Sequence, residues 1–296
     1  MNRQLVFVHG RSQQNKESKA LKLEWIEAWE HGLSKSGLNI PIREDQIRFP
    51  FYGDTLAQMS NGLSDEEAAK IVVRGEAPLP PSEKKFLESW LADLKNHYGM
   101  GDAEVAEALR KGQTRGVQNW GWVQAILEIV DRKVPGASAL TVAIATQDVY
   151  QYLNRPSFRT VMDNGVRSAF QAGTQTVVVS HSLGTVIAYN VLAEGAPAPG
   201  VIVPEFITLG SPLAVTAVKE GIKPLVYPSC VDVWFNALDQ RDVVALFPLD
   251  AKNFEVVPEI ENKTDIDNDT SNRHGITGYL SDAVVAKRIY QALTAP

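Results

Sequence analysis

Residues 179–184, Val-Ser-His-Ser-Leu-Gly, could carry out nucleophilic chemistry. A β-branched run at 176–179 leads into Ser182, and a helical apolar pattern follows at 183–192. A sharp strand-to-helix turn would expose the serine hydroxyl, and the helix N-terminus would offer N–H groups to a developing oxyanion. Such a turn needs small residues two positions to either side, and Ser180 and Gly184 meet that need. We interpret Ser182 as a nucleophile; the alternative is a serine that caps an ordinary helix.

Three motifs together resemble the α/β-hydrolase family, of the lipase and esterase type. They are Phe-Val-His-Gly at 7–10, Ser-His-Ser-Leu-Gly at 180–184 and Thr-Leu-Gly-Ser-Pro at 208–212. Within the family, the chain is similar to bacterial lipase-like serine hydrolases that begin directly at the His-Gly strand. The resemblance implies the chain order serine, acid, histidine.

The acid implied by this order follows the strand predicted at 231–236, and two carboxylates compete there. Asp242 stands before two valines, which resembles the acid-x-Val pattern of lipases. Asp239 stands three residues after the strand, which resembles another common spacing. We favour Asp242, whose role would be to orient an imidazole and stabilise its charged form, and Asp239 stays as the alternative.

The implied base is His274, because it is the one histidine that follows both carboxylates. It lies in a polar, glycine-flanked loop at 271–279 that leads into the last predicted helix. His181 is interpreted as a packing residue that points away from the turn.

The resemblance also implies an oxyanion hole made of backbone N–H groups. His9-Gly10 matches the family's oxyanion turn, which places one donor on Arg11 and the other on Leu183, after the nucleophile. Any side chain can follow such a turn, so Arg11 is identified by position only. His9 is expected to form structural hydrogen bonds beneath the turn.

The elements around these residues alternate between strands and helices. Such alternation predicts an α/β fold, a mostly parallel sheet with helices on both faces, as in the α/β-hydrolase fold. The predicted strands are 5–8, 47–52, 176–179, 205–209 and 231–236, with an edge strand at 254–257, and the helices are 17–36, 158–171, 183–192 and 279–293.

Residues 54–155 interrupt this alternation. They contain a helix start at 64–67, three prolines at 78–81 and helical patterns at 86–98 and 117–130. We predict a helical cap insertion at 54–155, with the hydrolase core formed by 1–53 and 156–296, and expect the cap over the carboxyl ends of the strands. Apolar side chains in this segment either line an acyl pocket or pack the cap against the core. They are Trp120, Trp122 and the apolar run 137–146.

Composition narrows the range of partners. The chain has 296 residues and a formal net charge of −6, so neither nucleic acid nor an anionic membrane is an expected partner. A single cysteine, Cys230, rules out an internal disulfide. The short first apolar run and the lack of a long apolar stretch suggest no signal peptide and no transmembrane segment, and we expect a cytoplasmic protein.

No metal site or cofactor is expected. Phosphate-loop, dinucleotide and zinc-helix motifs are missing. Residues 265–269 resemble the start of a calcium loop, but Thr270 and Ile276 occupy the places of the required glycine and glutamate. We interpret this segment as a solvated acidic loop.

The working hypothesis is a serine hydrolase that cleaves a small-molecule or lipid carboxylic ester through an acyl-enzyme. Thioester or amide cleavage, or acyl transfer, could use the same residues. A non-catalytic sensor or scaffold with a hydrolase fold is the alternative from another class. The acyl length, the head group and the oligomeric state stay open.

Overall fold

The centre of the protein is a sheet of six strands that all run parallel. The structure is a computed structural model that describes residues 3–10, 18–51, 80–112, 121–134 and 139–296. The strand order is β2-β1-β3-β4-β5-β6. The strands are β1 (Arg3–Val8), β2 (Ile47–Arg48), β3 (Gln175–His181), β4 (Val203–Leu209), β5 (Val231–Ala237) and β6 (Glu261–Lys263). The predicted α/β class is confirmed.

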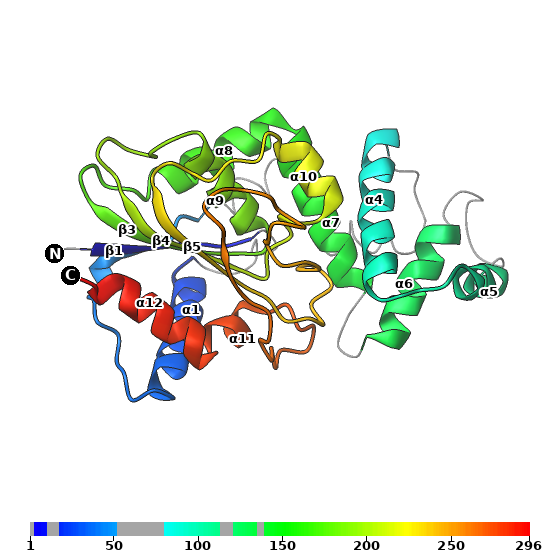
Figure 1. The fold of residues 1–296 in the computed structure, drawn as a ribbon, viewed down its shortest axis with the longest axis horizontal. Coiled ribbons are helices and arrows are strands. Elements are labelled where there is room, and N and C mark those ends of the chain that lie inside the picture. Colours follow the sequence, from blue (N-terminus) through cyan, green and yellow to red (C-terminus); the bar gives the residue numbers. More distant parts are fainter. Residues whose placement is uncertain (1–2, 11–17, 52–79, 113–120, 135–138) are drawn as a thin grey trace.

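Helices cover both faces of the sheet (Figure 1). On one face lie α8 (Pro156–Arg167), α9 (Leu183–Ala193) and α10 (Thr216–Ile222), and on the other lie α1 (Ser18–Ser34), α11 (Ile276–Leu280) and α12 (Ala283–Thr294). Each face has its own hydrophobic core. In β3, Val178 belongs to one core and Val177 and Val179 to the other. Burial on both sides explains why residues 177–179 of this strand are three consecutive valines rather than alternating apolar and polar residues.

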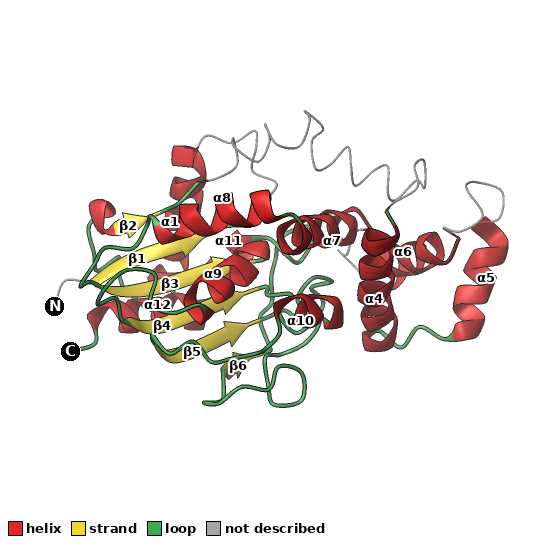
Figure 2. Cartoon of the chain, turned by 90° about the horizontal axis from the view of Figure 1, so that it is seen from above, coloured by secondary structure: helices red, strands yellow, loops and turns green. Residues whose placement is uncertain are grey.

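Within the described residues between β2 and α8 lie four further helices: α4 (Pro81–His97), α5 (Asp102–Gly112), α6 (Gly121–Lys133) and α7 (Ala139–Asn154). They lie beyond the carboxyl ends of the strands, toward which the arrows point in Figure 2. Helix α7 contacts α8 and α9 on the sheet side and α4 and α6 on the far side. The division of the chain into core and cap stays a prediction. No helix in the described ranges has the length and apolarity that crossing a membrane requires.

Some predicted elements differ from the structure. The edge strand predicted at 254–257 is wrong, because Phe254 is a buried loop residue and the edge strand is β6. The second strand has only two paired residues. The last predicted helix is two helices, and Asp282 begins the second by accepting hydrogen bonds from the N–H groups of Val284 and Val285. The helix start predicted at 64–67 lies outside the described residues.

Candidate active site

Ser182 occupies the turn between β3 and α9 in a conformation that L-residues rarely adopt. Its φ is 55° and its ψ is −131°. Its N–H donates to the Leu209 carbonyl of the neighbouring strand at 3.2 Å. Its own carbonyl accepts hydrogen bonds from the N–H and the hydroxyl of Thr185, at 2.9 and 2.7 Å. The surrounding structure therefore fixes a strained backbone, as is common at functional sites.

Two glycines bring the start of α9 against the end of β1. A Cβ at Gly184 would stand only 2.3 Å from the Val8 carbonyl oxygen, so a side chain is excluded there. A Cβ at Gly10 would stand 3.3 Å from Ser182 Cβ and 3.5 Å from Leu183 N. The turn after β1 and the turn after β3 are thus in contact. The order of the strands reverses around β1, and ligands of open α/β sheets bind at such a switch point.

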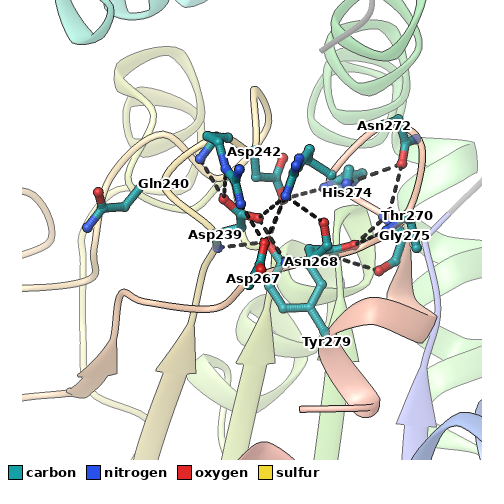
Figure 3. A network of polar contacts seen from close by, with 12 residues as sticks. Asp239, Gln240, Asp242, Asp267, Asn268, Thr270, Asn272, His274, Gly275 and Tyr279 are labelled. Carbon is teal, nitrogen blue, oxygen red and sulfur yellow. Dashed lines mark hydrogen bonds and ion pairs between the residues drawn. The ribbon is translucent and has the colours of Figure 1, made fainter. Parts of the chain in front are cut away.

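The structure brings Ser182, His274 and Asp242 together in one chain of hydrogen bonds. The Ser182 Oγ lies 2.9 Å from His274 Nε2. His274 Nδ1 lies 2.7 Å from Asp242 Oδ2 (Figure 3). The Ser182 side chain makes no hydrogen bond that caps α9, so the helix-cap alternative does not describe its hydroxyl.

Asp242 is fully buried and its carboxylate accepts several hydrogen bonds. Oδ1 accepts from the Val244 N–H at 2.8 Å, and Oδ2 accepts from the Tyr279 hydroxyl at 2.6 Å as well as from His274. Burial alone raises the pKa of Asp242, but its attraction to His274 and these hydrogen bonds outweigh burial, and the pKa is lowered overall. An ionised carboxylate can only accept, so the His274 proton belongs on Nδ1 and Nε2 can accept from Ser182.

Asp239, the other candidate acid, joins two loops instead. Its Oδ1 accepts from the Arg241 N–H at 2.8 Å, and its Oδ2 accepts from the Asn268 N–H at 2.9 Å. The Arg273 guanidinium lies 3.8 Å away. Asp239 therefore connects the loop that carries Asp242 to the loop that carries His274 (Figure 3).

The two other histidines near the turn are buried. His181 Nε2 lies 2.8 Å from the His274 carbonyl, so this nitrogen carries the proton. Burial, with a smaller contribution from His274, lowers the pKa of His181 to about 3. His9 stacks on Phe49 and hydrogen-bonds the Gly10 carbonyl, and burial lowers its pKa to about 4. His181 is therefore buried, but contrary to the prediction it does not point away from the site, because its ring packs against His274, hydrogen-bonds the His274 backbone and borders the same cavity as Ser182.

A cavity of about 270 Å³ opens beside Ser182 and His274. One wall is a single face of α7, with spacing i, i+3, i+4, i+7. The rest of the described lining comes from Glu24 of α1, from the turns after β1 and β3, and from the His274 loop and the start of α11. The residues that α7 contributes are Thr141, Ile144, Ala145 and Asp148. The apolar run at 137–146 therefore lines the cavity in part, whereas Trp122 is half-buried and packs against the core.

Sequence reasoning missed residues that position the loops. Tyr279 hydrogen-bonds Asp242, and nothing in its local sequence separates it from an ordinary core tyrosine. The side chain of Asn268 donates to the Gly275 carbonyl at 2.8 Å and accepts from the Thr270 N–H at 3.1 Å, which shapes the loop around His274. The contact with the Thr270 N–H is an Asx-turn, so the signal that could have found it is an asparagine within a polar loop.

Of the two predicted oxyanion donors, the structure describes Leu183, which follows Ser182 at the first position of α9. Arg11, the other predicted donor, and Trp120 of the predicted cap lie outside the described residues.

The acidic loop at 265–269 is held by ion pairs. Asp265 pairs with Lys263 at 2.7 Å, and Asp267 pairs with Arg241 and Arg273 at 2.6 and 2.9 Å. Over the described ranges, no group of three His, Cys, Asp or Glu residues is placed to hold a metal ion.

Comparison with known proteins gives no relative from which a function could be transferred. No protein-family model matches the chain, and neither the curated proteins nor the solved structures contain a significant match. The function is therefore inferred from the geometry of the site.

Proposed function

We propose that the protein is a serine hydrolase that cleaves a carboxylic ester through an acyl-enzyme. The observation that carries the proposal is the pair of short contacts Ser182 Oγ–His274 Nε2 at 2.9 Å and His274 Nδ1–Asp242 Oδ2 at 2.7 Å. A nucleophile within hydrogen-bond reach of a base, which a third group orients, is the recognised arrangement of such enzymes.

The surroundings of these three residues support the same proposal. Ser182 stands on a strained strand-to-helix turn at the carboxyl end of a parallel strand. The order serine, aspartate, histidine along the chain is that of α/β-hydrolases, and the parallel sheet covered by helices is compatible with that fold. A scaffold that had lost catalysis would have no reason to keep all three side chains in contact.

In the first step, Ser182 Oγ attacks the ester carbonyl carbon while His274 Nε2 takes the hydroxyl proton. Asp242 keeps its hydrogen bond to Nδ1–H and stabilises the imidazolium. The carbonyl oxygen becomes an oxyanion, to which the Leu183 N–H and, by position in the sequence, the Arg11 N–H would donate.

The tetrahedral adduct then collapses. Its bond to the alcohol oxygen breaks, and His274 gives its proton to the departing alcohol. A water molecule next attacks the acyl carbon, again giving a proton to His274. When this second adduct collapses, the carboxylic acid leaves and Ser182 Oγ recovers the proton.

The cavity fits a small ester or the reacting end of a lipid ester. Ile144, Leu183 and Ile276 offer apolar surface to an acyl group within about 270 Å³. A cavity of about 150 Å³ is known to hold a benzene ring, so there is room here for somewhat more than one such group.

Labelling with a fluorophosphonate probe tests the proposal. We expect covalent labelling that peptide mapping places on Ser182 and that Ser182→Ala abolishes. Nitrophenyl esters, thioesters and anilides then compare the possible acyl substrates. A wild-type protein that neither reacts with the probe nor hydrolyses any of these compounds would favour the non-catalytic sensor or scaffold.

A further inference from the structure

Tyr279 places a hydroxyl group inside the protein next to the buried carboxylate of Asp242. The side chain is fully buried in α11. Its Oη accepts a hydrogen bond from the Asp239 N–H at 3.2 Å and donates to Asp242 Oδ2 at 2.6 Å. Because a backbone N–H can only donate, the Tyr279 proton is left to point at Asp242. The direction of this hydrogen bond is therefore fixed.

The hydroxyl shares its acceptor with the base. Asp242 Oδ2 accepts from both the Tyr279 hydroxyl and His274 Nδ1–H (Figure 3). Its Oδ1 accepts from the Val244 N–H. Rotation of the carboxylate would break contacts on both of its oxygens. A buried carboxylate that lost one donor would have no water to replace it.

We propose that Tyr279 is a positioning residue of the site, whose hydroxyl holds the Asp242 carboxylate in the orientation that His274 requires. The proposal rests on the proposed function, since it concerns the same three residues. Tyr279 acts through Asp242 and is not itself expected to touch the substrate.

The Tyr279 hydroxyl also reduces the negative charge on the Asp242 oxygen that contacts His274. A donor on Oδ2 draws negative charge away from the oxygen that contacts the imidazole. Without it, Asp242 would favour the protonated form of His274 more strongly. The acid limb of the pH–rate profile should then move to higher pH, because His274 must be neutral to accept the serine proton.

Other charged or titratable groups face this hydrogen bond. Asp239 is held by Arg241 and Arg273 from two loops. The His181 ring lies 5.9 Å from the Tyr279 ring. Tyr98, at the end of α4, also faces the carboxylates of Asp242 and Asp239, and burial together with these two charges raises its pKa. Tyr279→Phe changes none of these side chains, but it removes the acceptor of the Asp239 N–H as well as the donor to Asp242. A shift of the profile therefore reports the loss of the hydroxyl and of its two hydrogen bonds.

The test compares Tyr279→Phe with Tyr189→Phe. Tyr189 is a matched control because its buried hydroxyl also makes two hydrogen bonds, to the Val226 carbonyl at 3.1 Å and from the Val226 N–H at 2.9 Å, away from Asp242. For nitrophenyl butyrate at pH 7, we expect Tyr279→Phe to lower kcat/KM about 10-fold, equivalent to about 1.4 kcal/mol. The loss should fall on kcat rather than KM, and the acid limb should move to higher pH. Tyr189→Phe should keep the wild-type rate and profile.

A second readout does not depend on activity. The downfield proton resonance of His274 Nδ1–H should be present in the wild type, move in Tyr279→Phe and stay in place in Tyr189→Phe. If the wild type hydrolyses esters and Tyr279→Phe keeps its rate, profile and resonance, the role of Tyr279 is overturned and the proposed function stands. If the wild type is inert but the resonance moves only in Tyr279→Phe, the proposed function fails and the positioning contact stands.

Discussion

At Ser182, the backbone is strained where the chemistry is proposed to occur. Its φ of 55° costs an L-residue free energy that glycine would largely avoid. We therefore expect Ser182→Ala and Ser182→Gly both to abolish probe labelling, with Ser182→Gly more stable to unfolding than Ser182→Ala by about 1 kcal/mol. Urea denaturation of the two variants measures this difference. Equal stability would mean that the turn stores no strain at this residue.

The two neighbouring aspartates should respond differently to the same substitution. Asp242→Asn should lower kcat by about 10³–10⁴-fold, because the amide favours the wrong imidazole tautomer. Asp239→Asn should change kcat much less, but it should lower the free energy of unfolding by about 1–3 kcal/mol, since it weakens the contacts between two loops. Ester kinetics and urea denaturation separate the effects. The reverse ranking of kcat would assign the acid to Asp239.

Sequence alone could locate the proposed acid within this loop and favoured Asp242, but it could not exclude Asp239. Asp239 and Asp242 are three residues apart and both are buried. What separates them is the direction of each side chain, which depends on Asn268 and Tyr279 from distant parts of the chain. Ser182 and His274 are the clearer predictions from sequence, because the local strand-turn-helix pattern and the small number of histidines limit the choice.

At the scale of the elements, one face of α7 lines the cavity and the opposite face packs against the hydrophobic core. Ile144 lies on the cavity face. We expect Ile144→Ala to lower kcat/KM about tenfold for nitrophenyl esters longer than butyrate, while acetate is unaffected, because only long acyl chains would contact the lost side chain.

Trp122→Ala is the matched control for Ile144→Ala. Trp122 is half-buried against the core and is not among the described residues that line the cavity. Its truncation should lower the free energy of unfolding by about 1–3 kcal/mol and leave the chain-length preference unchanged. An equal loss for every ester in the Ile144 variant would show that α7 does not contact the acyl chain.

How well each strand or helix can be predicted from the sequence depends on how it is buried. The strands buried on both faces have unbroken apolar runs, and these were located from sequence. The edge strand β6 has the sequence Glu-Asn-Lys, which carries no hydrophobic pattern, so the sequence instead predicts a strand in the apolar segment at 254–257. The break between α11 and α12 depends on the Asp282 cap within a continuous helical pattern.

For the whole molecule, buried neutral histidines predict a loss of stability in mild acid. The pKa values of His9 and His181 are lowered from 6.5 to about 4 and about 3 by burial. The unfolded chain therefore binds more protons below pH 6.5, and the free energy of unfolding should fall as the pH falls, by about 2 kcal/mol per histidine at pH 5. Urea denaturation between pH 7.5 and 5 measures the slope. His181→Gln should remove about half of it; an unchanged slope would mean that His181 does not contribute.

The pairing of β1 with β3 has a consequence for how much the connecting chain can vary. Arg3 and Gln175 are partners in the register although they stand 172 positions apart. The entropy lost in closing so long a loop changes slowly with its length, by only about 0.6 kcal/mol for each halving or doubling. Helices between β2 and α8 could thus be gained, lost or exchanged at little thermodynamic cost to the sheet. Ser182, Asp242 and His274 follow this segment, so the reacting groups could stay in place while the cavity wall is rebuilt around a different substrate.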